Sequence, residues 1–197
     1  MSEEPLRVMA VVGSLNKSAV TRFMVRHVAE LMRAPDVNVD VLDFMDEPLA
    51  LFNPDTAKEA QGFDRLKKRV EEADVYILGT PDYHGSISSA MKNFLDHFWH
   101  EFAGKLFVPM VASYEKGLTV TDQIRTVARQ CYAWTLPYGV SFADRTDVQN
   151  EQIVSEALKQ RLEMMVRDVR VYGSLIARQR RADLAGKEPG FMAKHRT

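Results

Sequence analysis

The fold is decided by the stretch VYILGTPDYHGSISSAMKNFLD, residues 75–96. Its apolar run 75–79 is typical of a buried parallel strand, and the apolar residues from Met91 to Phe102 recur at helical spacing. Between them lies a loop rich in Gly, Pro and Ser, and Ser88 is placed to cap the helix. This strand–loop–helix unit predicts a parallel α/β sheet.

Similar units precede and follow this stretch. We expect strands at 8–12, 37–42, 75–79, 106–112 and 138–142, and helices at 18–34, 63–73, 91–102, 121–134 and 150–178. Pro109 indicates an edge position or a bulge in its strand. The alternation predicts one domain over residues 1–197, a three-layer α/β fold with helices on both faces of a five-stranded parallel sheet. Residues 43–60 form a functional or packing loop, and the polar tail from about residue 182 is expected to be loose.

Composition narrows the function classes. The 197 residues carry a net charge of −1, which gives no electrostatic reason to expect nucleic acid or an anionic membrane as a partner. The single cysteine, Cys131, excludes an internal disulfide, and its neighbours favour a buried apolar role. No signal peptide and no apolar run of about 20 residues is visible, so we expect a cytoplasmic protein without a membrane anchor.

The first loop, residues 13–22, reads GSLNKSAVTR and follows the first strand. In parallel sheets ligands bind beyond the carboxyl ends of the strands. Short polar side chains at the start of a helix, together with Lys17 and Arg22, suit a phosphate group. The alternative is that Ser18 is only a helix cap and Arg22 only a solvated cation.

Two further loops follow the third and fourth strands. In the loop 80–88, Pro81 stiffens the exit from the strand, Gly85 permits close approach to a flat ligand, and Tyr83 and His84 bring rings to the rim. The alternative is a plain turn followed by a helix cap. The loop 113–118 offers a hydroxyl, an aromatic ring and a glycine, and is uninformative alone.

Other sites are disfavoured. The chain has neither a Gly-x-x-x-x-Gly-Lys-Ser/Thr nor a Gly-x-Gly-x-x-Gly motif, so Asp43 is interpreted as a loop acid rather than a ribose ligand. His97, His100 and Glu101 share a helical stretch with several large aromatic residues. We interpret that stretch as a partner-facing or partly buried helix rather than a metal site.

Together the loops resemble the NADPH-dependent FMN reductase family of flavodoxin-like flavoproteins. The strongest match is residues 80–96, TPDYHGSISSAMKNFLD, against a Pro-Glu-Tyr-Asn-Gly-Ser loop that leads into a Leu-Lys-Asn-x-x-Asp helix; Gly104-Lys105 also matches. The first loop is similar to the pattern Gly-Ser-x-Arg-x-x-Ser-x-Thr-Arg. Asn16 departs from a frequent Arg, Ala19 from a usual Ser and His84 from a common Asn, which affects phosphate affinity and the flavin edge.

The resemblance implies a flavodoxin-like sheet in the order 2-1-3-4-5 and FMN as cofactor. The residues it implies around the phosphate are Ser14, Asn16, Ser18, Val20, Thr21 and Arg22. Those it implies along the isoalloxazine ring are Pro81, Asp82, Tyr83, His84, Gly85 and Ser86. Those it implies on the far side are Ser113, Tyr114 and Gly117.

The expected activity is that of an NAD(P)H-dependent oxidoreductase. Hydride would pass from NADPH or NADH to flavin N5 and then to a small acceptor: a quinone, free flavin, an azo or nitro compound, or a metal oxyanion. We expect no catalytic side chain and no metal. A flavodoxin-type electron carrier and a flavin-binding regulatory protein without turnover are the alternatives.

We also expect a homodimer or homotetramer. Apolar residues cover more than one face of the expected helix 91–102, and Trp99 is among them. The alternative is that Trp99 packs on the loop 43–60.

Overall fold

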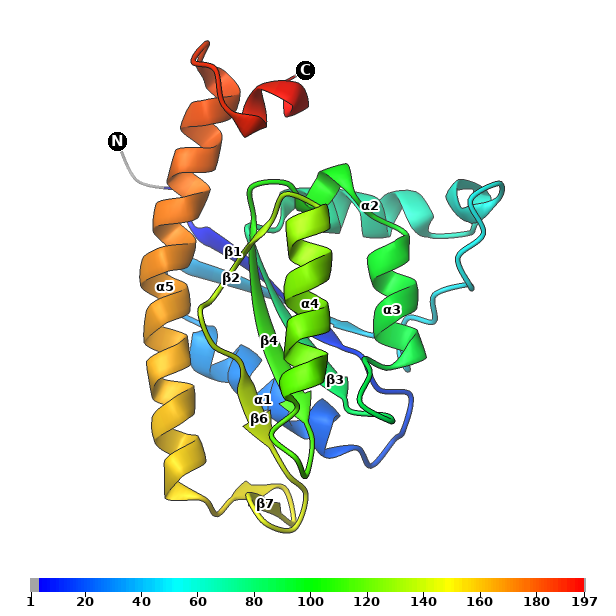
Figure 1. Ribbon diagram of the computed structural model, residues 1–197, viewed down its shortest axis with the longest axis vertical. Coiled ribbons are helices and arrows are strands. Elements are labelled where there is room, and N and C mark those ends of the chain that lie inside the picture. Colours follow the sequence, from blue (N-terminus) through cyan, green and yellow to red (C-terminus); the bar gives the residue numbers. More distant parts are fainter. Residues whose placement is uncertain (1–3, 197) are drawn as a thin grey trace.

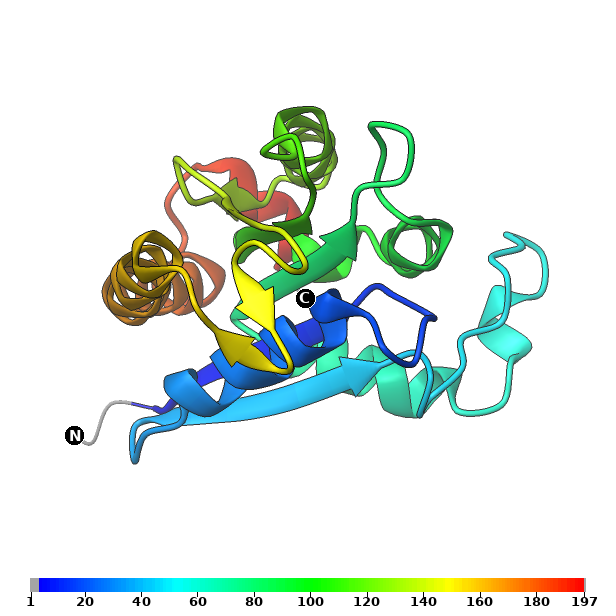
Figure 2. The same cartoon turned by 90° about the horizontal axis from the view of Figure 1, so that it is seen from below.

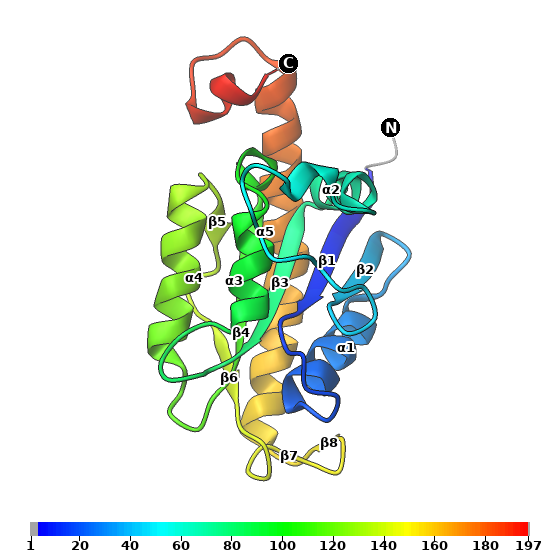
Figure 3. The ribbon, with the colours of Figure 1, turned by 90° about the vertical axis from the view of Figure 1, so that its right-hand side faces the viewer.

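The sheet is parallel throughout in a computed structural model that describes residues 4–196. Its strands are β1 (Leu6–Val12), β2 (Val37–Asp43), β3 (Val75–Pro81), β4 (Leu106–Ala112), β5 (Trp134–Thr135) and β6 (Val140–Phe142). The order β2-β1-β3-β4-β5 confirms the predicted flavodoxin-like topology. Figure 3 shows β2, β1 and β3 side by side.

The last strand of the sheet is split in two, so the sheet has six strands rather than the expected five. β5 pairs with residues 106–107 of β4 and β6 with residues 110–112, and the break falls opposite Pro109. Proline offers no N–H to a ladder, which accounts for the interruption. Pro109 therefore lies in an interior strand and not at an edge.

Helices cover both faces of the sheet (Figure 1). α1 (Val20–Met32) and α5 (Glu156–Ala185) share a core with Val8, Ala10 and Val12. α2 (Phe63–Glu72), α3 (Ser89–Asp96) and α4 (Leu118–Gln130) share the other core with Met9 and Val11. This split follows the two-residue period of a strand buried on both faces.

The helix expected at 91–102 is shorter than predicted. α3 ends at Asp96, and a 3-10 turn, η2 (His100–Phe102), follows. Phe94, Phe98 and Phe102 are all buried in the chain's own core, so the expected surplus of apolar helix surface is wrong. Among these rings only Trp99 is exposed, at 54%. Its Nε1 donates to the carbonyl of Gln130, so the ring lies toward the end of α4 and not on the loop 43–60.

The C-terminal third also differs from the expectation. β7 (Val148–Gln149) and β8 (Gln152–Ile153) form a hairpin whose turn residues Asn150 and Glu151 have positive φ. α5 therefore begins only at Glu156, where Ser155 caps it. A third 3-10 turn, η3 (Phe191–His195), which follows η1 (Ala57–Glu59) and η2 in the chain, buries Met192 against the end of α5, so the tail beyond residue 182 is not loose. Figure 1 shows α5 extending past the sheet and η3 folding back on it.

Lys105, which belongs to the Gly104-Lys105 pair that resembles the family pattern, links β4 to α2. Its Nζ donates to the carbonyls of Val70 and Glu71 in the last turn of α2, at 2.7 Å each. Burial, followed by the nearby Arg180, lowers the pKa of Lys105 to about 7.

Cys131 is buried as well, and burial raises its thiol pKa to about 11, which makes it a poor nucleophile. Among residues 4–196, no helix is long and apolar enough to cross a bilayer.

Candidate functional site

The three predicted loops meet at one cleft of about 800 Å³ beyond the carboxyl ends of β1, β3 and β4. Figure 2 looks onto this end of the molecule. The predicted residues that line the cleft are Ser14, Asn16, Ser18, Val20, Thr21, Pro81, Asp82, Tyr83, His84, Gly85, Ser113 and Tyr114. Arg22, Ser86 and Gly117 lie outside its lining.

The cleft has further walls that the sequence analysis missed. They are Ala19, Ala112, Glu115, Leu118, Thr119, Ala143 and Asp144. Ala143 and Asp144 directly follow β6, so the rule that located the other loops applies to them too. A strand at 138–142 was expected, but the loop after it, residues 143–147, contains no glycine or aromatic ring of the kind that singled out the other loops.

The start of α1 is uncapped by any side chain among residues 4–196. Its N-cap is Ala19, whereas Ser18 donates through Oγ and through its backbone N–H to Oδ1 of Asn16, at 3.1 and 3.0 Å. The reading of Ser18 as a helix cap is therefore wrong. The first N–H groups of a helix have no intrahelical acceptor, so those of Val20 and Thr21 are available at the cleft together with the positive end of the helix dipole.

Gly13 joins the first loop to the second. Its N–H donates to the carbonyl of Gly79 at 2.7 Å, and its own carbonyl accepts from the hydroxyl of Ser88. A Cβ at Gly13 would lie 2.7 Å from that Gly79 oxygen and 2.8 Å from Cε of Met91. No other residue fits this crossing without displacing β3 or α3. Ser88 also caps α3, as predicted.

Arg22 is engaged with an acid. Its guanidinium makes a two-pronged ion pair with Asp43, with Nε–Oδ2 at 2.7 Å and Nη2–Oδ1 at 2.8 Å. Arg26 binds Asp43 and Asp46 as well. Burial would raise the pKa of Asp43, but the hydrogen bonds from Arg22, the Met45 amide and Arg26 outweigh it and lower that pKa. Asp43 is thus the anchor of two arginines, consistent with a loop acid.

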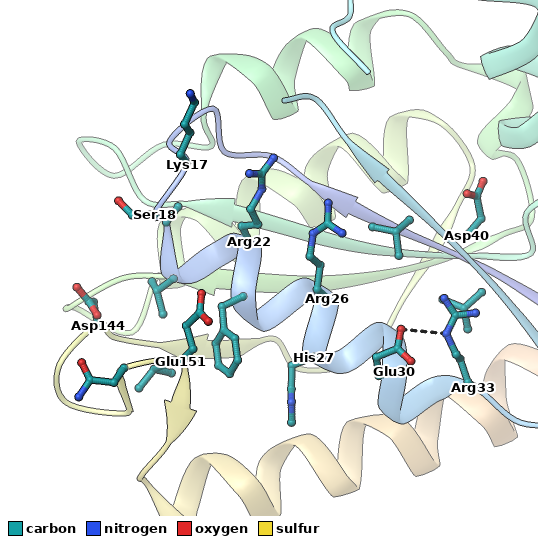
Figure 4. A pocket seen from close by; sticks show the side chains of 17 residues that line it. Lys17, Ser18, Arg22, Arg26, His27, Glu30, Arg33, Asp40, Asp144 and Glu151 are labelled. Atoms are coloured by element: carbon teal, nitrogen blue, oxygen red, sulfur yellow. Dashed lines mark hydrogen bonds and ion pairs between the residues drawn. The ribbon is translucent and has the colours of Figure 1, made fainter. Parts of the chain in front are cut away.

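A groove of about 900 Å³ lies beside the cleft, between α1, β2 and the β7–β8 hairpin (Figure 4). It shares Ser18, Ala19, Val20 and Asp144 with the cleft. Several of its charges are paired, as in the Glu30–Arg33 bridge of 3.0 Å. The groove lacks the convergent loop ends, so the cleft is the better candidate site although it is smaller.

The second loop forms a tight two-residue turn. Tyr83 and Ser86 exchange both backbone hydrogen bonds, at 3.0 and 3.1 Å, and His84 and Gly85 between them have φ of 57° and 75°. These features define a type I′ turn. Asp82 supports it from below, because Oδ1 accepts from the Gly85 N–H at 2.8 Å and Oδ2 accepts from the Ser113 hydroxyl at 2.9 Å.

The third loop contributes an exposed ring and a sharp entry to α4. Tyr114 is 77% exposed and Tyr83, across the cleft, 53%. Gly117 is the N-cap of α4 with φ of 57°, and a Cβ there would lie 2.5 Å from Cγ1 of Val111. Gly117 therefore shapes the loop without lining the cleft.

The histidines of the predicted aromatic helix do not converge. Nδ1 of His97 bonds to the Asn93 carbonyl at 2.8 Å, and its ring packs on Phe52. His100 lies against Trp99 instead, with ring centroids 4.2 Å apart. Within residues 4–196, no group of three or more metal-ligating side chains comes together.

Comparisons with known proteins identify a family and related folds. Residues 6–147 match the family model described as NADPH-dependent FMN reductase. An FMN-dependent NADPH-azoreductase from Staphylococcus aureus is 25% identical over 154 residues, which cover 74% of this chain and 81% of that protein.

Solved structures share the fold. An NADH:FMN oxidoreductase (EMOB) in its apo form aligns with a TM-score of 0.71 at 18% identity, covering 85% of this chain and 89% of that one. The NAD(P)H:(acceptor) oxidoreductase FerB from Paracoccus denitrificans gives a TM-score of 0.66 at 16% identity, covering 88% and 98%. An archaeal flavodoxin gives a TM-score of 0.56 at 14% identity, again covering 88% and 98%.

Proposed function

The chain belongs to the NADPH-dependent FMN reductase family, and on that premise we propose that its cleft binds FMN between the start of α1 and the turn at residues 83–86. Membership makes the protein an NAD(P)H-dependent FMN oxidoreductase. The observation that carries the proposed site is the uncapped start of α1 opening into the same cleft as a type I′ turn with exposed rings.

The donors at the first loop fit a phosphate. Asn16 and Ser18 hold each other, which shapes the loop and leaves the N–H groups of Val20 and Thr21 to an anion. Helix starts of this kind bind phosphate through free N–H groups and the helix dipole. Ser14, Asn16 and Ser18 line the same end of the cleft and would complete the set, and Arg22 would join only by loosening its pair with Asp43.

The turn and the third loop fit a flat ring. Gly85 has no side chain to block close approach, and Tyr83 and Tyr114 provide exposed aromatic faces. Pro81, Asp82, His84 and Ser113 would complete this end, with Ser86 and Gly117 supporting it from outside the cleft. When bound, FMN supplies the hydride chemistry at N5, so the chain itself needs to position and orient rather than to provide an acid or a nucleophile.

The acceptor is proposed as a small flat or oxidising molecule: a quinone, free flavin, an azo or nitro compound, or a metal oxyanion. The azoreductase relative favours testing an azo dye first. Steady-state oxidation of NADPH and of NADH, each with an azo dye and with a quinone, tests the proposal. Bound FMN without turnover would instead favour an electron carrier or a regulatory protein, although the net charge of −1 does not resemble the strongly acidic carriers.

We also infer that the chain assembles as a homodimer or homotetramer. The support is a group of exposed rings at the end opposite the cleft: Trp99, Tyr132, Trp134 and Phe191, each at least 40% exposed. Aromatic residues are enriched in interfaces. Light scattering at micromolar concentration should give a multiple of the chain mass, and Trp99→Asp should reduce it to one chain. A single-chain mass for the FMN-loaded protein excludes this assembly.

A further inference from the structure

We propose that Gln123 of α4 is a positioning residue for FMN, which acts by fixing the backbone of the turn at residues 83–86. The inference rests on the proposed function, because it assumes that this turn meets the flavin ring. Gln123 itself lines the groove between α3 and α4 and not the cleft. Its influence on the ligand is therefore indirect.

The Gln123 amide uses both of its ends on the turn. Oε1 accepts from the hydroxyl of Ser86 and from the N–H of Ile87, each at 3.1 Å. Nε2 donates to the carbonyl of Gly85 at 3.2 Å. One side chain from a distant helix thus fixes three consecutive residues at the end of the turn.

This arrangement determines which backbone groups of the turn remain for a ligand. The Gly85 N–H bonds to Asp82 and its carbonyl to Gln123, while Tyr83 and Ser86 satisfy each other. Within residues 4–196, the N–H and carbonyl of His84 are the only backbone groups of the turn without a hydrogen bond. Since His84 lines the cleft, its amide is the donor that the turn offers to the ring edge.

The turn needs such support because its backbone is costly. His84 has φ of 57°, a region that a non-glycine residue enters at a free-energy cost. Without Gln123, the Gly85 carbonyl loses its donor and the Ile87 N–H loses its acceptor, so the turn keeps only the Tyr83–Ser86 and Asp82–Gly85 hydrogen bonds and can shift. The His84 amide would then no longer be held at one position relative to the ring.

The test compares Gln123→Leu, which removes all three bonds, with Gln123→Glu, which keeps acceptor oxygens for Ser86 and Ile87 but loses the donor to Gly85. Gln130→Leu, on an exposed position at the far end of α4, is the matched control. FMN affinity is measured by titration, the two-electron potential at saturating FMN, and the thermal midpoint on the FMN-free proteins.

We expect Gln123→Leu to raise the FMN dissociation constant about tenfold, as the loss of several neutral hydrogen bonds implies. Because the ring edge becomes electron-rich on reduction, reduced FMN should lose about tenfold more affinity than oxidised FMN, which lowers the potential by about 30 mV. Gln123→Glu should fall between the wild type and Gln123→Leu, and Gln130→Leu should match the wild type.

A purely structural role would lower the thermal midpoint of Gln123→Leu and leave the potential of bound FMN unchanged, which overturns the proposal. If the wild type binds FMN and Gln123→Leu binds it with the same affinity and potential, only the role of Gln123 is refuted. If the wild type does not bind FMN, the proposed function fails and this inference fails with it.

Discussion

The two ends of the cleft are built in opposite ways. The phosphate loop, residues 14–18, is shaped by hydrogen bonds between residues two apart, as between Asn16 and Ser18. The ring turn, residues 83–86, is held by side chains far along the chain, Ser113 through Asp82 and Gln123 directly. The conformation of a locally bonded loop can be predicted from its own residues, whereas that of a turn held by distant side chains cannot.

Gly13 connects the phosphate loop to β3 and to the start of α3 through its hydrogen bonds with Gly79 and Ser88. Substituting it should have the largest effect on stability and on FMN binding. Gly13→Val brings a side chain against the Gly79 carbonyl and Met91, so both loops must shift. We expect a loss of about 3 kcal/mol in unfolding free energy from overpacking, and no measurable FMN binding. Urea unfolding and FMN titration measure the two effects.

Gly190→Ala is the matched control for Gly13→Val, because a Cβ at Gly190 meets nothing within 4 Å. It should leave both stability and FMN affinity unchanged. A Gly13→Val protein that still binds FMN like the wild type would contradict the proposed coupling of the two loops.

Arg22 tests whether full charge or backbone donors dominate at the phosphate end. Arg22→Ala should weaken FMN binding about tenfold if the guanidinium reaches the phosphate, since charge-assisted bonds contribute about 1.5–3 kcal/mol. It should also cost about 2 kcal/mol of stability, because Asp43 is buried and loses one of its partners. FMN titration and denaturant unfolding separate these effects.

The double variant Arg22→Ala/Asp43→Asn removes the stranded carboxylate as well. Recovery of stability without recovery of affinity supports a direct phosphate contact by Arg22. Unchanged affinity in Arg22→Ala would assign Arg22 to the Asp43 ion pair alone and leave the phosphate to the start of α1.

His84 tests the ring end, where backbone conformation should matter more than the identity of the side chain. His84→Asn should stabilise the chain by about 0.5 kcal/mol, because Asn tolerates positive φ better, and FMN affinity should change less than about threefold. His84→Val should destabilise it by about 1 kcal/mol or more, because β-branched residues resist this conformation. Equal stability of the Asn and Val variants would mean that the turn is not held at positive φ.

The smallest expected effect is on the pH dependence of stability, which reports on the ion pair of Asp43 beside the phosphate loop. The pKa of Asp43 is lowered in the folded chain, so its contribution to stability is present above the unfolded pKa, near 3.8, and is lost as the pH falls through the lower folded value. Asp43→Asn should therefore flatten the stability curve below about pH 4. The comparison is urea unfolding of FMN-free wild type and variant across that range, and parallel curves would argue against a stabilising ion pair.

The strands and the three loops were predictable because most strands are short apolar runs that end in Gly or Pro or in a polar loop, and the sheet order followed from the family resemblance. The start of α5 was not, because the turn at Asn150 and Glu151 uses positive φ in residues that also suit a helix. Similarly, the helix expected at 121–134 ran on to the first residue of β5, since two residues that pair only with β4 carry no periodicity of their own.

At the site, prediction succeeded where residues touch their sequence neighbours and failed where they act at a distance. Twelve of the fifteen proposed residues line the cleft. The pairing of Arg22 with Asp43 spans 21 residues and the support of Gly85 by Gln123 spans 38, and neither leaves a local pattern. Ala19 at the N-cap looked like a defect in the family pattern, yet it leaves the first turn of α1 without a competing side chain.

A crystal structure of the chain with FMN tests the proposed site most directly. We expect the phosphate on the N–H groups of Val20 and Thr21 at the start of α1, with the ring edge at the His84 amide between Tyr83 and Tyr114. FMN bound instead in the groove between α1 and the β7–β8 hairpin, or its phosphate held away from α1, would contradict it.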